Sequence, residues 1–538
     1  MKRTLILLFT CISLLQFNAC KRDTGPSWDV GIVLPLAHAS LSIDGLLTDS
    51  LTTTNADGSI KLVYSTKFLA LETDTLFKFP DTTVANVFHL PIGYANLAPG
   101  SFLIPPSTPT QTEFNVSNVE IVMGILTDGL MTMKFKNDIR KRVIVQYQIP
   151  CATLNSIPFS VTFLIPAAPD SLHSSIANNT VSLAGYTIDF TGTNNDRVNT
   201  ITTLFTAQID PTEIGNITIY PSDTVSANSD FSNIKPYYIR GYFGNETIQI
   251  GPEETSFSLF NKIQSGSIGL DSLKMSIGIT NYLGMDSRLT FNGIWSRNTY
   301  TNQTVQLNNS LIGNPININR GVLTSSWLPV IPSTYNFIFD NSNSNAKALI
   351  ENLPHKLGFD VTLVTNPLGN VSGNNDFFFS DYGIEATLDV EMPLNLFADQ
   401  LIITDTVIPN FSSITFKENI LKGKLTLLAA NSFPFDAAID LYFIDVNGNT
   451  IGSLVSQSNT INSGPVTLSG GYLVSTGTAN SQLTIPLSET QTSGMLNCEK
   501  IVFKAKFDTN SNPVYAKIFA SNHLDINLSA DFDYRIGN

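Results

Sequence analysis

Short runs of alternating apolar and polar residues recur along the whole chain. Residues 61–71 (KLVYSTKFLAL), 159–166 (FSVTFLIP) and 438–446 (AIDLYFIDV) are examples, and clusters of Gly, Asn, Asp and Pro separate such runs. A period of two is typical of a β-strand with one buried face, and the separating residues favour turns. The pattern predicts an all-β fold of several tandem antiparallel β-sandwich modules, immunoglobulin-like and elongated.

Two polar segments predict hairpin turns, and one apolar segment predicts a short helix. The turns are expected at residues 55–58 (NADG) and 445–449 (DVNGN). The second segment also offers oxygen atoms suited to calcium, but it lacks the later bidentate Glu of an EF-hand, which favours a turn. A helix is expected over residues 344–353, ended by Pro354, and its apolar face would comprise Ala346, Leu349, Ile350 and Leu353.

A weak internal echo links three distant segments. The segments end at Asn137 (GLMTMKFKN), Asn281 (SLKMSIGITN) and Asn431 (GKLTLLAAN), which we call the echo asparagines. They are spaced 144 and 150 residues apart, and a second strand pattern follows each one. Asn tolerates a left-handed backbone and bonds to its own turn, so strand-turn-strand physics alone can produce this pattern. The spacing nevertheless favours three related β modules.

Proline-rich segments suggest where the modules meet. Residues 99–114 and 321–334 are the candidate boundaries, although such segments also occur at sheet edges. We expect a signal peptide and four β regions, the last containing the short helix: 1–19, 20–112, 113–235, 236–335 and 336–538.

The first twenty residues have the features of a bacterial lipoprotein signal. Lys2 and Arg3 precede a short apolar stretch, and Ala19 precedes Cys20, the predicted lipidation site. Phe17 and Asn18 depart from the usual motif of small residues, so cleavage of an ordinary secretory signal after Ala19 is the alternative. Diacylglycerol with an amide-linked acyl chain on Cys20 would anchor the chain to a membrane. We expect an outer-membrane, lipid-anchored protein at the cell surface.

The net charge of the chain disfavours nucleic acid and anionic lipid as partners. The chain has 44 acidic and 30 basic residues, and removing Lys2 and Arg3 with the signal leaves 28 basic residues and a net charge of −16. Such a chain repels nucleic acid and anionic lipid. Beyond the signal, no apolar run reaches the roughly 18 residues of a transmembrane helix.

The sequence lacks the residue patterns that are typical of catalytic sites. The sequence contains no GxSxG, HExxH, P-loop or GxGxxG motif, and its five histidines are isolated from one another. We therefore expect no enzyme activity, no catalytic residue, no cofactor and no metal. A glycan-degrading enzyme, the weak alternative, would need two carboxyl groups about 5 to 10 Å apart in a cleft. Cys151 and Cys498 either pair in an oxidising envelope or remain two buried thiols.

Two aromatic groups are candidate sugar-stacking surfaces. They are Trp295 with Tyr300, and Tyr237-Tyr238 with Tyr242. Packing in the core or across strands is the usual fate of aromatic residues in β proteins, and we expect it here.

Seven Asp-(Ser/Thr) triplets are similar to the O-glycosylation signal of Bacteroidota envelope proteins. The same dipeptides are common in turns, so only some of these sites are expected to be modified. The candidate acceptors are Ser50, Thr75, Thr82, Ser171, Thr224, Ser272 and Thr406.

Several segments resemble cell-envelope lipoproteins of the Bacteroidota, whose mature chains often open with a Trp-led strand. They are residues 26–30 (PSWDV), 34–36 (LPL), 43–47 (IDGLL), 241–244 (GYFG), 279–281 (ITN) and 366–367 (NP). The strand-Asn-strand units also resemble late-embryogenesis-abundant type 2 modules, which are immunoglobulin-like sandwiches. Neither resemblance implies a catalytic residue.

These observations favour a protein that binds, adheres or supports the envelope without catalysis. Its partners would be the membrane, through the lipid, and a glycan or an envelope protein. The alternative is a periplasm-facing lipoprotein that handles lipid or assists envelope assembly, which would require an apolar groove or internal cavity.

Overall fold

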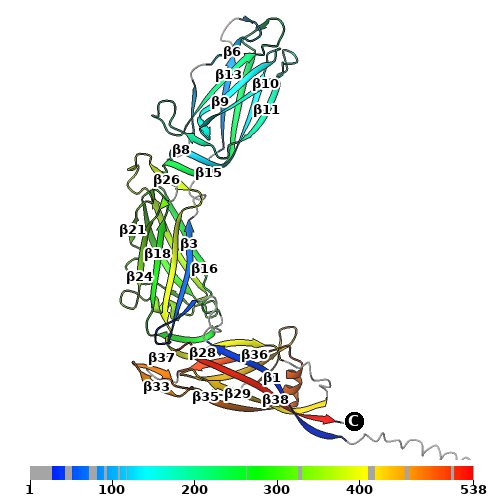
Figure 1. The fold of residues 1–538 in the computed structure, drawn as a ribbon, viewed down its shortest axis with the longest axis vertical. Helices are drawn as coiled ribbons and strands as arrows, with labels where there is room; N and C mark the ends of the chain where they lie inside the picture. The colour runs from blue at the N-terminus through cyan, green and yellow to red at the C-terminus, as the bar shows by residue number, and fades with distance from the viewer. Residues whose placement is uncertain are drawn as a thin grey trace, which may run out of the picture.

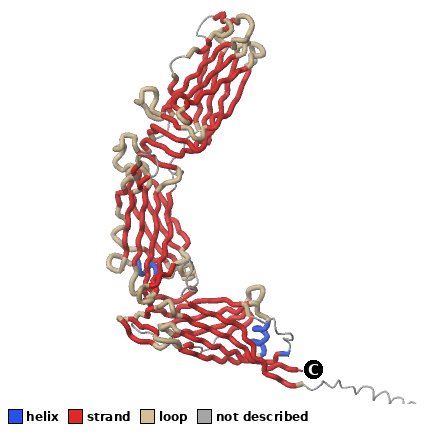
Figure 2. Tube along the Cα trace, viewed as in Figure 1, coloured by secondary structure: helices blue, strands red, loops and turns tan. Residues whose placement is uncertain are grey.

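The structure is a computed structural model in which strands dominate (Figure 2). The all-β prediction is confirmed. Cys20, Ser50 and Thr75 lie outside the described residues. The described ranges are 27–42, 51–71, 81–89, 94–106, 109–114, 116, 118–261, 263–324, 330–409, 419–454, 460–509 and 514–536.

Three β-sandwiches follow one another in an elongated body (Figure 1). We call them basal, middle and distal; the basal sandwich contains both ends of the described chain. Each has one four-stranded layer of the same order, in which the third strand ends at one of the three echo asparagines. This layer comprises β1 (Trp28–Ser42), β38 (His523–Ile536), β29 (Ile420–Asn431) and β35 (Ala479–Leu487) in the basal sandwich; β3 (Ile60–Leu71), β27 (Ile384–Pro393), β18 (Lys274–Asn281) and β24 (Ser333–Phe339) in the middle one; and β4 (Thr82–His89), β15 (Thr224–Tyr242), β8 (Glu120–Asn137) and β11 (Ser175–Ser182) in the distal one.

The second layer repeats in the same way. It comprises β28 (Asn395–Val407), β36 (Lys500–Asp508), β30 (Asp436–Ile444) and β31 (Thr450–Leu454) in the basal sandwich; β16 (Thr247–Ser256), β25 (Lys356–Thr365), β19 (Ser287–Arg297), β20 (Thr304–Gln306) and β21 (Pro315–Ile318) in the middle one; and β6 (Phe102–Ile104), β7 (Thr110–Glu113), β13 (Thr200–Ile209), β9 (Val143–Leu154) and β10 (Ile157–Ile165) in the distal one.

Shorter strands complete the edges and junctions. In the distal sandwich β12 pairs with both β8 and β9 and so joins the two layers. The additional strands are β2 (Leu51–Thr54), β5 (Ala95–Leu97), β12 (Thr187–Asp189), β14 (Ile217–Ile219), β17 (Ile263–Leu270), β22 (Val322–Leu323), β23 (Val330–Ile331), β26 (Asp376–Phe379), β32 (Thr460–Ile461), β33 (Val466–Ser469), β34 (Tyr472–Ser475) and β37 (Ala516–Lys517).

The sandwiches are nested in sequence. The chain first forms the opening strand of each four-stranded layer (β1, β3 and β4). It then completes the distal sandwich through β15, the middle one through β27 and the basal one through β38. As a result β1 and β38 pair antiparallel from Trp28–Ile536 to Ser42–His523. Strands within residues 20–112 are therefore shared among all three sandwiches, and the predicted region boundaries stay predictions.

The three echo asparagines occupy equivalent, fully buried positions. Each side-chain oxygen accepts the backbone N–H two residues later, at 2.9 Å. Each side-chain amide donates to the carbonyl that follows a short strand on the edge of the second layer. The acceptors are Pro166 after β10 at 2.9 Å, Asn319 after β21 at 2.8 Å and Asn462 after β32 at 3.0 Å. The weak sequence echo thus marks one hydrogen-bonded corner that is built three times.

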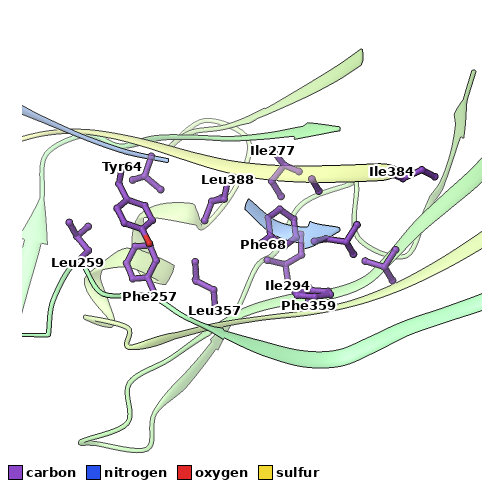
Figure 3. Close-up of a cluster of buried hydrophobic side chains, with 14 of the residues drawn as sticks. Tyr64, Phe68, Phe257, Leu259, Ile277, Ile294, Leu357, Phe359, Ile384 and Leu388 are labelled. Carbon is purple, nitrogen blue, oxygen red and sulfur yellow. The ribbon is translucent and has the colours of Figure 1, made fainter. Parts of the chain in front are cut away.

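The core of each sandwich lies between its two layers. In the middle sandwich Tyr64 packs edge-on against Phe257 at 4.7 Å, and Phe68 against Phe359 at 5.4 Å between ring centroids. Figure 3 shows these rings with Leu388 and Ile277 on one side and Leu357 on the other. Burial of this alternating apolar set is the main force that holds the layers together.

The junction between the distal and middle sandwiches is aromatic. The long strand β15 continues beyond the distal layer and pairs with β26, where Tyr238 lies opposite Phe379. Both side chains are fully buried, and their ring centroids are 4.8 Å apart. A strand shared by two sandwiches, together with buried rings, resists bending at this junction.

The junction between the middle and basal sandwiches is formed by backbone and polar contacts. The N–H of Ile60 donates to the carbonyl of Ile518 at 3.1 Å. Lys517 Nζ lies 2.6 Å from the carboxylate of Asp57, and the Tyr472 hydroxyl donates to Asp271 at 2.8 Å.

The described chain contains two short helices and a tight turn at Asp445. The expected helix is α4 (Ala346–Glu351), and a second helix, α5 (Glu489–Leu496), was not expected. The segment 445–449 forms a turn in which Asp445 accepts the N–H groups of Asn447 and Asn449, so the turn interpretation is confirmed. Cys151 and Cys498 form no disulfide and belong to different sandwiches.

Candidate functional site

The distal sandwich ends in a tip made of the loops beyond its strands. Its Asn137 corner points away from the middle sandwich, because the opposite ends of β8 and β15 lead to the junction (Figure 1). In the basal and middle sandwiches, the chain leaves the first strand of the four-stranded layer (β1 or β3) and forms at least one entire further sandwich before it reaches the second layer. In the distal sandwich the corresponding connection is only residues 90–101, and part of it pairs as β5 with β14. The tip is therefore the outer end of the nested array.

Ion pairs hold two of the tip loops together. Lys141 lies 3.4 Å from Glu213, and Arg142 lies 2.8 Å from Glu213 and 3.0 Å from Asp210. The hydrogen bond from Arg142 lowers the pKa of Glu213, and hydrogen bonds from Thr212 lower the pKa of Asp210. These carboxylates stay charged at neutral pH and fix the loops beneath the outermost residues.

Large apolar side chains project from three of the loops at the tip. Leu172 is 88% exposed, Ile214 is 87% exposed and Tyr94 is 73% exposed. Tyr94 lies beside Tyr220, with ring centroids 6.5 Å apart. Exposed apolar side chains over a fixed polar base are typical of protein contact surfaces.

A cleft of about 700 Å³, lined by both polar and apolar side chains, lies at the inner end of the distal sandwich. Arg240, Asp189, Cys151 and several threonines line it. Burial raises the pKa of Cys151 to about 11, so this thiol is a poor nucleophile at neutral pH. The cleft has the volume of a small-molecule site without an activated side chain.

An apolar cavity of about 40 Å³ lies inside the distal sandwich, among residues that include Phe114, Phe190 and Phe231. This volume has room for a few water molecules at most. It is too small for an acyl chain.

The two predicted aromatic groups differ in burial and location. Tyr238 is buried at the distal–middle junction, and Tyr237 packs edge-on against Phe379 at 5.6 Å, so packing is confirmed for this pair. Tyr242 is half-buried. Trp295 is half-buried on the outer face of the middle sandwich, and Tyr300 is exposed and contacts His355 edge-on at 4.5 Å.

The indole of Trp295 lies across the neighbouring strand. It covers Gly358, its cross-strand partner, where a Cβ would stand only 2.0 Å from the ring. The indole N–H donates to Glu254 at 3.1 Å, and Arg297 also donates to Glu254. Burial acts to raise the pKa of Glu254, but these donors outweigh it and lower that pKa. The ring is therefore held in one orientation on the sheet.

A row of polar side chains continues from Trp295 along the same outer face. Asn292 donates to Asp360 at 3.2 Å and to Thr362 at 2.8 Å, and Thr362 donates to Gln249 at 2.9 Å. Gln249 also donates to Asp360. Together with Trp295, these exposed or half-buried groups form what we call the Trp295 face: Gln249, Glu254, Asn292, Trp295, Asp360 and Thr362.

The candidate O-glycosylation acceptors in the described chain lie in separate places. Ser171 and Thr406 are exposed, whereas Thr82, Thr224 and Ser272 are half-buried. Asp170 accepts the N–H of Leu172 at 2.7 Å, and Thr224 donates to Asp138, so these two triplets form local turn or corner contacts. Modification at any of the sites remains a prediction.

Two carboxylates meet near the distal–middle junction. Asp286 and Asp376 both contact Arg320, at 2.9 and 3.2 Å. Asp376 is buried, and burial raises its pKa. The shared guanidinium makes this a structural ion cluster, whereas a glycosidase needs an open pair of carboxyl groups. Within the described ranges, no group of three or more His, Cys, Asp or Glu side chains could hold a metal ion.

Comparison with known proteins gives distant matches only. No protein family and no curated protein matches the chain. A crystal structure of a Parabacteroides distasonis protein described as secreted is 12% identical, over 53% of this chain and 82% of that chain, with a TM-score of 0.27. The VP2 subviral particle of infectious bursal disease virus is 10% identical, over 87% of this chain and 83% of that chain, with a TM-score of 0.12.

At such TM-scores neither structure supports an inference about this chain. The resemblance to Bacteroidota lipoproteins and to late-embryogenesis-abundant modules therefore stays a prediction. In the part of the chain that the structure describes, no helix is long and apolar enough to cross a membrane.

Proposed function

We propose that this protein is a lipid-anchored stalk that displays its distal sandwich away from an outer membrane, in a binding or adhesion role. The observation that carries the proposal is the pairing of β1 with β38 along their whole lengths. It places the first described strand in the sandwich farthest from the tip (Figure 1). Cys20 precedes Trp28 by eight residues, so a lipid on Cys20 would tether the basal end.

The direction of β1 adds support. Its Ser42 end, next to His523, faces the middle sandwich, since the segment just before β38 contacts β3 through Ser59 and Phe519. Its Trp28 end therefore points outward from the base. A membrane anchor attached there leaves the whole array free to extend.

The junctions suit a stalk because strand pairing and packed rings bridge the distal–middle junction, and hydrogen bonds and an ion pair bridge the middle–basal one. The exposed apolar residues of the tip suit contact with another macromolecule. The lipid-handling alternative requires an apolar volume large enough for an acyl chain, and the apolar cavity of about 40 Å³ in the distal sandwich does not meet that requirement.

A cysteine substitution tests the anchor. We expect Cys20→Ala to abolish labelling by an alkyne-tagged fatty acid and to move the protein out of the membrane fraction. Cys11→Ala, a substitution in the apolar stretch of the signal, is the matched control and should leave both unchanged. Retained labelling in Cys20→Ala would exclude the proposed anchor.

Epitope insertion tests the display geometry. One tag replaces Gly215 at the tip and another replaces Gly448 in the basal turn; a side chain at either position would point into open space. On intact cells, antibody should bind the tip tag, and energy transfer from a membrane dye should be weaker at the tip than at the base. Equal transfer at both positions would contradict a stalk, and protection of both tags in intact cells would indicate an inward-facing protein.

A further inference from the structure

We propose that the Trp295 face is a binding site for a neutral glycan chain, with the indole as the platform on which one sugar ring stacks. The proposal goes beyond the display role, because it concerns the side of the middle sandwich and needs no lipid anchor. It rests on three features of the face: a supported ring, a polar row next to it, and the charge of that row.

The ring is supported from below and oriented from the side. Gly358 leaves the space in which the indole lies, and Gly293 on its own strand leaves its Cβ position 3.7 Å from the ring. The hydrogen bond to Glu254 uses the indole N–H and fixes the ring. An aromatic face carries partial negative charge, which attracts the C–H groups on the face of a pyranose. A ring that is already oriented loses little conformational entropy when a sugar stacks on it.

The polar row lies at the right place for the hydroxyl groups of the sugar. Asp360 follows Gly358 by two residues on β25 and shares its outer face, which corresponds to a separation of roughly 7 Å along the strand. Asn292 and Thr362 bond to each other at 2.8 Å within the same row. Carboxamide and hydroxyl groups both donate and accept hydrogen bonds, and a carboxylate accepts them from neighbouring hydroxyls.

Charge favours a neutral sugar over an acidic one. Within the described residues, the contacts of Asp360 are the amides of Gln249 and Asn292, and no ion pair involves it. This carboxylate accepts hydrogen bonds from sugar hydroxyls and repels a uronic acid. Lys356 and Arg297 lie beyond the indole at the other end of the face and point to Ser256 and Glu254.

A fluorescence titration tests the proposal directly. Trp28→Phe and Trp327→Phe in the chain of residues 21–538 leave Trp295 as the only tryptophan. The probes are soluble cellulose, mannan, xylan and starch oligosaccharides, with oligogalacturonate as the acidic comparison. We expect a saturable change in Trp295 emission with at least one neutral probe and none with oligogalacturonate.

Polar variants separate binding from folding. Asp360→Asn and Asn292→Ala should each weaken binding about tenfold, as expected for the loss of one good hydrogen bond, while the melting temperature stays close to that of the parent. Tyr300→Ala, an exposed aromatic on the same sandwich, is the control and should bind normally. No emission change with any neutral probe at millimolar concentration, or equal binding by all three variants, would overturn the proposal and leave Trp295 a cover for Gly358.

Discussion

The Asn281 end of the middle sandwich and the Asn137 end of the distal sandwich share one backbone design but have opposite surroundings. After Asn281 comes Tyr282, which packs against Tyr382 at 5.3 Å in the aromatic junction. After Asn137 comes Asp138, a carboxylate that pairs with Lys136 at 3.1 Å. Burial acts to raise the pKa of Asp138, but its hydrogen bonds outweigh this and lower it.

The difference shows how one corner serves two purposes. Where another sandwich covers the corner, the residues around it are aromatic and bury apolar surface. Where the corner is the outer tip, the residues around it are charged, and ion pairs hold the loops in place of a neighbour. Both corners keep the buried asparagine, because the same buried turn is formed in either environment.

Breaking the covered corner should have the largest effect. Tyr238→Ala removes a fully buried ring and should lower the free energy of unfolding by about 3–5 kcal/mol. Chemical denaturation measures the loss, and small-angle scattering should show a wider range of overall dimensions as the junction loosens. Tyr94→Ala at the tip removes a ring that is 73% exposed and should change neither measurement.

Removing the shared asparagine should have an intermediate and similar effect at both corners. Asn137→Ala and Asn281→Ala each leave backbone groups without partners, which should cost about 2–3 kcal/mol. Denaturant titration of each variant measures this cost, with the exposed Asn178→Ala as control. A loss at only one corner would mean that the corners are not equivalent in energy.

The reactivity of Cys151 should report how well the inner end of the distal sandwich is buried. Because burial raises its pKa to about 11, alkylation by iodoacetamide should be slow at pH 8 and should accelerate as the pH approaches 11. The unfolded chain loses this proton at lower pH than the folded chain, so stability should fall as pH rises through this range. Peptide mass spectrometry identifies the labelled thiol, and fast labelling at pH 8 would contradict the burial.

Disturbing the open corner should have the smallest effect. Glu213→Gln removes one of the two carboxylate partners of Arg142 at the tip, where a single ion pair near solvent contributes little. The pKa of Glu213 is lowered in the folded chain, so its contribution is present above the ordinary Glu pKa and disappears as pH falls through the lowered value. The small difference in melting temperature between variant and parent should therefore be seen at pH 7 and vanish once the pH is below the lowered pKa.

Several features were predictable because their signals are local. The alternating runs, the turn at Asp445 and the helix α4 each depend on neighbouring residues. Helix α5 also carried a local signal that the prediction missed, a capping box in which Ser488 and Gln491 bond to each other's backbone. The outer orientation of Trp295 had no such signal, because a half-buried tryptophan looks the same in sequence whether it faces a core or a sheet surface.

By itself, the amino-acid sequence determined the all-β class and the recurrence of a strand-Asn-strand unit, since these follow from side-chain period and from turn chemistry. The burial of each asparagine in one hydrogen-bonded corner came from the tertiary structure. Only the tertiary structure decided which strands pair. Alternation determines which side of a strand is buried but does not determine which strand it pairs with. For example, β1 pairs with β38, which lies nearly five hundred residues away in the sequence. The nested order, the position of the tip and the Trp295 face all depend on that choice, because each joins residues that are distant in the chain.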